Sequence, residues 1–99
     1  MTIELTELKS FLSGYFHEDW ELDNAEPDEV ITLFLESRPY ESVLERIVEQ
    51  IRWYLDSGKD DITVEQGLLN DLGCYYLPSA DGIGAKEWLR HVADRLRFG

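Results

Sequence analysis

The sequence contains a single cysteine, Cys74, and no stretch that approaches the roughly 20 consecutive apolar residues needed to span a bilayer. With one cysteine no internal disulfide can form, so nothing points to an oxidising compartment. The first thirty residues also lack the basic segment and the uninterrupted apolar segment of a secretory signal. These absences predict a cytoplasmic protein that does not associate with membranes.

Basic residues are scarce. Nine lysines and arginines stand against 21 aspartates and glutamates, which gives a formal net charge of -12. Because a phosphate backbone would repel such a chain, we expect no nucleic-acid partner. No lysine or arginine occurs between Lys9 and Arg38, whereas this interval carries Glu18, Asp19, Glu21, Asp23, Glu26, Asp28, Glu29 and Glu36. The acidic interval has two interpretations: it solubilises the protein, or it attracts a basic partner.

Strand-like alternation does not persist anywhere, and no internal repeat is visible. The apolar residues instead recur at helical spacing, which predicts helices over residues 2–14, 27–37, 39–57, 62–72 and 85–97. At 99 residues with 43% hydrophobic residues, the chain fits one domain around one core. We therefore expect an all-α fold, a compact single-domain bundle of about five helices over residues 1–99.

The helix over residues 39–57 has the longest apolar stripe, so we expect the other helices to pack on it. In the helix over 27–37, Pro27 suits the first position, and Val30, Leu33 and Phe34 are expected to face inward. Thr63 or Asp61 is expected to cap the fourth helix, in which Gly67 costs about 1 kcal/mol relative to alanine. The acidic interval before Pro27 is expected to be irregular.

The residues that suggest chemistry are few. His17 with Glu18 or Asp19 offers an imidazole and carboxylates for a metal site or for acid and base catalysis. The alternative is that His17 and Trp20 cover one end of the core while the carboxylates face water. Cys74 has no activating neighbour in sequence and is expected to be a small core residue.

Aromatic residues adjoin the acidic interval. If Tyr15, Phe16 or Trp20 were exposed, these rings would supply the desolvated anchors of a tight protein complex, and the carboxylates would steer a cationic partner toward them. If the rings are buried, they belong to the core and the acids solubilise the surface.

Three sequence words carry a family resemblance. YFHEDW at residues 15–20, LGCYY at 72–76 and WL at 88–89 resemble the immunity proteins of bacterial contact-dependent growth inhibition systems. The resemblance implies a cytoplasmic inhibitor, without a cofactor and not an enzyme, which binds the toxic C-terminal domain of a delivered effector, often a nuclease. The matching residues are expected to be scaffold rather than interface: Tyr15, Phe16, His17, Trp20, Gly73, Cys74 and Tyr75.

An immunity protein that binds and neutralises a cognate toxin domain is therefore the leading hypothesis. Its attractive surface, called here the predicted acidic surface, consists of Glu18, Asp19, Glu21, Asp23, Glu26, Asp28 and Glu29. Two alternatives remain open: a small metal-dependent enzyme that uses His17 and its neighbouring carboxylates, or a general acidic adaptor that mimics nucleic acid and binds many basic proteins.

Overall fold

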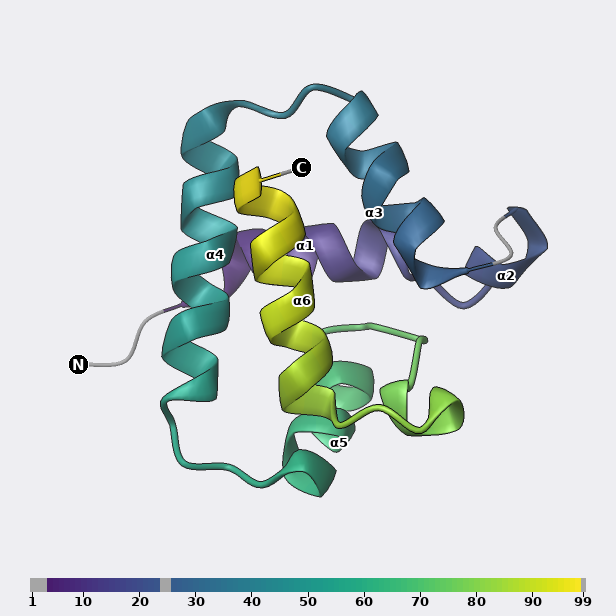
Figure 1. Cartoon of the computed structure of the whole chain (residues 1–99), viewed down its shortest axis with the longest axis vertical. Helices are drawn as coiled ribbons and strands as arrows, with labels where there is room; N and C mark the ends of the chain where they lie inside the picture. Colours follow the sequence, from purple (N-terminus) through teal and green to yellow (C-terminus); the bar gives the residue numbers. More distant parts are fainter. Residues whose placement is uncertain (1–3, 24–25, 99) are drawn as a thin grey trace.

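The computed structural model describes residues 4–23 and 26–98 (Figure 1). Its elements are, in order, α1 (Thr6–Tyr15), α2 (Trp20–Asp23), α3 (Pro27–Glu36), α4 (Glu41–Leu55), α5 (Asp61–Asn70), the 3-10 helix η1 (Pro78–Asp81) and α6 (Ala85–Phe98). Within these described ranges there is no strand, so the all-α prediction is confirmed. The acidic interval was expected to be irregular, and this was wrong for Trp20–Asp23, which forms α2.

Several predicted helix ends shift by a few residues. The first helix begins at Thr6, and residue 2, its predicted start, lies outside the described residues. Pro27 opens α3 as predicted. The N-cap of α5 is Asp60, not Thr63 or Asp61, because the Asp60 carboxylate accepts a hydrogen bond from the Thr63 backbone N–H at 2.8 Å. This hydrogen bond lowers the pKa of Asp60.

The inward face of α3 differs from the prediction at one position. Val30 and Phe34 are buried as expected, but Leu33 is 50% exposed and Ile31 is fully buried in its place. Positions 30, 31 and 34 lie within about half a turn of each other on a helix of 3.6 residues per turn, and position 33 falls to one side of that face.

The central helix is α6 rather than α4. It packs against α4, α5, α3 and η1, while α1 packs on α4 and α3. Figure 1 shows α4 and α6 side by side, with α1 crossing them. The buried face of α6 extends along the helix through Ala85, Trp88, Leu89, Val92 and Leu96. Because this face lies among four elements, α6 organises the core together with α4.

Gln50 is the one fully buried polar residue that the core holds among the described residues, and it joins α4 to α1. Its Oε1 accepts from the Leu8 backbone N–H at 2.9 Å, and its Nε2 donates to the Glu7 carboxylate at 2.8 Å. Leu8 lies in the first turn of α1, where backbone N–H groups have no partner within the helix. Gln50 therefore acts as a cap supplied by a neighbouring helix, and its hydrogen bond is the main cause of the lowered pKa of Glu7.

Replacing Gln50 by leucine is expected to lower the free energy of unfolding by about 1–3 kcal/mol, because the Leu8 N–H would remain buried without an acceptor. Urea denaturation followed by circular dichroism measures the change. Gln66→Leu, at an exposed position of α5, is the matched control and should change stability by less than about 0.5 kcal/mol. Equal effects of both substitutions would contradict the capping role.

Gly67 lies within α5 and is buried against Tyr54 of α4. A Cβ at position 67 would overlap the Tyr54 hydroxyl, so the glycine permits the close approach of the two helices. Packing thus explains the presence of a residue that disfavours the helix.

Gly67→Ala is expected to destabilise the protein by about 1–2 kcal/mol, although alanine is the better helix former, because overpacking outweighs propensity. In a Tyr54→Phe background the hydroxyl is absent, and the same substitution should be neutral or stabilising. Thermal and urea unfolding of the four proteins in this double-mutant cycle measure the coupling. Destabilisation of equal size in both backgrounds would show that the hydroxyl is not the cause.

Candidate functional site

Four aromatic side chains from three segments that are distant in sequence meet in the core, and one of these segments is α6. Phe16 packs edge-on against Trp20 and Trp88, with ring centroids 5.8 and 5.3 Å apart. Tyr76 packs against Trp20 at 5.7 Å and against Trp88 at 5.0 Å. All four rings are buried. The three sequence words that carry the family resemblance therefore converge on one aromatic cluster, consisting of Phe16, Trp20, Tyr76 and Trp88.

Hydrogen bonds fix the chain around this cluster. The Tyr75 N–H donates to the Phe16 carbonyl at 2.8 Å, and the Trp20 indole N–H donates to the Tyr75 carbonyl at 3.3 Å. Gly73 has a φ of +66°, and a Cβ there would lie 2.9 Å from the Ser13 Cβ. The turn that leads into residues 74–76 thus requires glycine for its backbone conformation and for space.

The residues of the sequence words occupy different environments. Phe16, Trp20 and Cys74 are buried, and Tyr15 is half-buried against Phe34, with centroids 5.1 Å apart. His17 is exposed, and Tyr75 is 48% exposed. Phe16 and Trp20 are therefore core residues and do not form exposed anchors.

The arrangement around His17 offers little chemistry. Its Nδ1 accepts a hydrogen bond from the Asp19 backbone N–H at 3.1 Å. In the part of the chain that the structure describes, no three histidine, cysteine or acidic side chains are grouped so that they could hold a metal ion. Burial raises the pKa of the Cys74 thiol to about 12, so this side chain is a protonated core residue and not an activated nucleophile.

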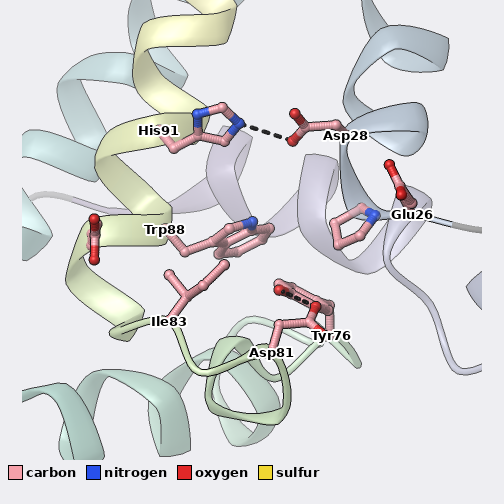
Figure 2. Close-up of a pocket in the computed structure, with 9 residues that line it drawn as sticks. Glu26, Asp28, Tyr76, Asp81, Ile83, Trp88 and His91 are labelled. Carbon is pink, nitrogen blue, oxygen red and sulfur yellow. Dashed lines mark hydrogen bonds and ion pairs between the residues drawn. The ribbon is translucent and has the colours of Figure 1, made fainter.

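A groove of about 690 Å³ lies between the start of α3, η1 and the first turns of α6, and it is called here the α3–α6 groove. Figure 2 shows the side chains around it, with Asp28 and His91 on one side and Tyr76 and Asp81 on the other. Its lining is Glu26, Pro27, Asp28, Tyr76, Asp81, Ile83, Glu87, Trp88 and His91. Four carboxylates thus surround a space whose only basic lining group is an imidazole.

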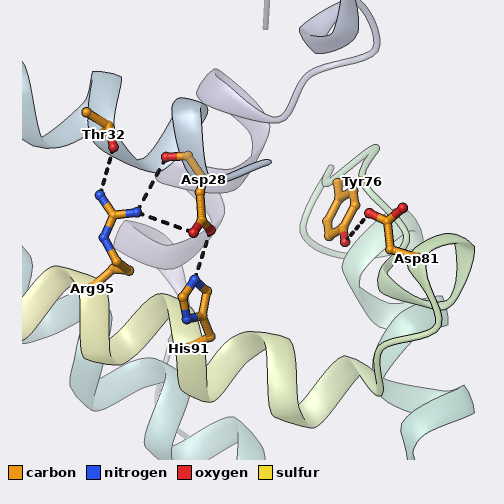
Figure 3. A network of polar contacts seen from close by, with 6 residues as sticks. All are labelled: Asp28, Thr32, Tyr76, Asp81, His91 and Arg95. Atoms are coloured by element: carbon orange, nitrogen blue, oxygen red, sulfur yellow. Dashed lines mark hydrogen bonds and ion pairs between the residues drawn. The ribbon is translucent and has the colours of Figure 1, made fainter. Parts of the chain in front are cut away.

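Two groups of polar contacts set the walls of this groove (Figure 3). Asp28 pairs with His91 Nε2 at 2.8 Å and with Arg95 at 3.7 Å, and Arg95 also donates to the Thr32 hydroxyl at 2.7 Å. These contacts join α3 to α6. Opposite them, the Tyr76 hydroxyl donates to Asp81 at 2.8 Å. The pKa of Tyr76 is raised by burial first, and then by the neighbouring Asp81 and Asp28 carboxylates.

A second groove of about 450 Å³ adjoins the first. It shares Pro27, Tyr76 and Asp81 with the α3–α6 groove and adds Glu21 of α2 and the exposed Tyr75. The two grooves therefore form one acidic depression with an aromatic side chain at its edge, next to the aromatic cluster.

Most residues of the predicted acidic surface are exposed to solvent. Glu18, Asp19, Glu21, Glu26, Asp28 and Glu29 are exposed, whereas the side chain of Asp23 lies outside the described part. Of the six, Asp28 also forms the link to α6. Sequence reasoning missed Asp81 and Glu87, although the four-residue spacing of Glu87 and His91 indicates a shared helix face.

No helix in the described ranges is long and apolar enough to cross a membrane.

Comparison with known proteins gives two findings. The family model described as CdiI immunity protein matches residues 4–96. The fold is similar to a chain in the crystal structure of the CdiA-CT/CdiI complex from Y. kristensenii 33638, with a TM-score of 0.83 and 23% identity over 93% of this chain and 97% of that chain. No curated protein matches the sequence.

The family match covers nearly the whole chain, and it confirms the resemblance drawn from the three sequence words. It also agrees with the expectation of an inhibitor and not an enzyme. The chain therefore belongs to the CdiI immunity protein family.

Proposed function

We propose that this protein binds the CdiA-CT toxin domain of its own growth inhibition system in the cytoplasm and neutralises it. The observation that carries the proposal is the set of exposed carboxylates beside the acidic depression. Membership in the CdiI family supports it, as does the similarity to a chain from a CdiA-CT/CdiI complex.

The charge of the protein suggests how neutralisation works. A toxin that acts on nucleic acid needs a basic surface to attract phosphate, and an acidic protein is drawn to that surface by the same force. Once bound there, the immunity protein excludes the substrate by its bulk and by its charge. We therefore propose a nuclease as the toxin and the predicted acidic surface as the part of this protein that attracts it.

A general acidic adaptor would also attract basic proteins. The two functions differ in specificity, because an immunity protein combines charge with a shaped contact, whereas an adaptor depends on charge. Toxin domains of similar charge from unrelated systems separate them, since broad binding favours the adaptor.

Reversing three charges of the predicted acidic surface, with Asp19, Glu21 and Asp23 all changed to lysine, is expected to slow association with the cognate toxin domain about tenfold or more at low salt. Stopped-flow fluorescence with a catalytically inactive toxin domain measures the rate. The loss should shrink as the salt concentration rises, because counterions screen exposed charges.

The matched control reverses Glu41, Glu45 and Glu49, which are exposed on α4 away from the acidic depression. Both variants change the net charge equally. If both slow association to the same extent, total charge rather than this surface steers the toxin. Unchanged rates in the first variant would remove these three residues from the attractive surface.

A further inference from the structure

Trp88 carries a polar group that the fold leaves without a partner. Its side chain is 3% exposed, and its indole N–H is the one buried side-chain polar group without a hydrogen-bond partner among the described residues. The indole of Trp20, in the same aromatic cluster, donates to the Tyr75 carbonyl. Buried donors are normally satisfied in folded proteins, so this one calls for an acceptor outside the chain, either water or a bound partner.

The unpaired N–H lies at the α3–α6 groove, which Trp88 lines. Figure 2 shows the indole nitrogen on the edge of the ring that faces His91 and Asp28. The acceptors nearby are already engaged: Asp28 holds His91 and Arg95, and Asp81 accepts from Tyr76. His91, whose side chain is exposed on α6, lies on the same side of the groove as Asp28.

The lining of the same groove contains no lysine or arginine. Glu26, Asp28, Asp81 and Glu87 line it, and the side chains of Glu26 and Glu87 form no hydrogen bond or ion pair with the part of the chain that the structure describes. The groove therefore offers excess negative charge at its walls and one hydrogen-bond donor at its base. A ligand that satisfies both must carry a positive group and an acceptor close together.

A basic residue within a polypeptide has this combination, because its side chain is cationic and its backbone carbonyl is an acceptor. Arginine suits the groove better than lysine. Its planar guanidinium binds several carboxylate oxygens at once, sheds water more readily, and stacks on aromatic rings such as Tyr76. The groove volume of about 690 Å³ admits a side chain together with its backbone.

We propose that the α3–α6 groove receives an arginine of the toxin domain, with its guanidinium between the α3 carboxylates and Asp81 and a backbone carbonyl of the same segment on the Trp88 indole N–H. This inference rests on the proposed function and identifies the contact through which the protein holds its toxin. The incoming arginine replaces His91 as a partner of Asp28 and thereby uncovers the indole.

The test compares two double variants that remove the same charge. Glu26→Gln with Asp81→Asn neutralises both sides of the groove while keeping side-chain shape and an acceptor for Tyr76. Glu41→Gln with Glu49→Gln does the same on α4, away from the groove. Calorimetry with the inactive cognate toxin domain should show at least tenfold weaker binding for the groove variant and less than twofold for the control.

Nuclear magnetic resonance of protein labelled with ¹⁵N in its tryptophan indoles gives an independent readout. On addition of the toxin domain the Trp88 indole proton should move downfield as it gains an acceptor, while that of Trp53 on α4 stays in place. Trp53→Phe assigns the control resonance, and Trp20→Phe separates the remaining two, because Trp20 and Trp88 both lie against the Tyr76 ring.

The outcomes separate the two proposals. If the toxin domain binds but the groove variant binds as tightly as the control, or the Trp88 resonance does not move, the arginine site is overturned and the proposed function stands. If the unaltered protein does not bind the toxin domain, both proposals fail.

Discussion

The contact of Phe16, Trp20, Tyr76 and Trp88 joins segments that lie up to 72 positions apart, and the arrangement of the rest of the molecule depends on it. These rings bury a large apolar area and pack mostly edge to face, a geometry that aromatic pairs prefer. Through them the chain after α1 and the loop before η1 are both held against α6. The acidic depression exists because the start of α3, η1 and α6 are kept at this separation.

Charges around this cluster both oppose and assist folding. The interval between Lys9 and Arg38 has no lysine or arginine of its own, so its carboxylates repel one another. Arg95 of α6 offsets part of this repulsion at Asp28, to which His91 also forms a hydrogen bond. The remaining carboxylates of the predicted acidic surface whose side chains the structure describes stay exposed, as the proposed attraction of a basic partner requires.

The sequence predicted what depends on local rules. Pro27 marked the start of α3, the apolar period identified all five of the longer helices, and three short words identified the family. It did not predict features that depend on partners distant along the chain. The role of Gln50 required the neighbouring end of α1, and the glycine at position 67 is explained only by Tyr54 of another helix.

The candidate site was likewise predicted only in part from the sequence. The acidic interval was visible as a charge pattern, but Asp81 and Glu87 join it only because η1 and α6 fold beside α3. The unpaired Trp88 donor could not be read from the sequence, since a tryptophan at helical spacing predicts a core residue regardless of what its nitrogen contacts.

The most direct test of the account is the growth of bacteria that express the cognate CdiA-CT domain inside the cell, measured with and without this protein. The account predicts that growth stops without the protein and is restored when it is present, and that a toxin domain from an unrelated system is not neutralised. Continued arrest in the presence of abundant, folded protein would contradict the central claim.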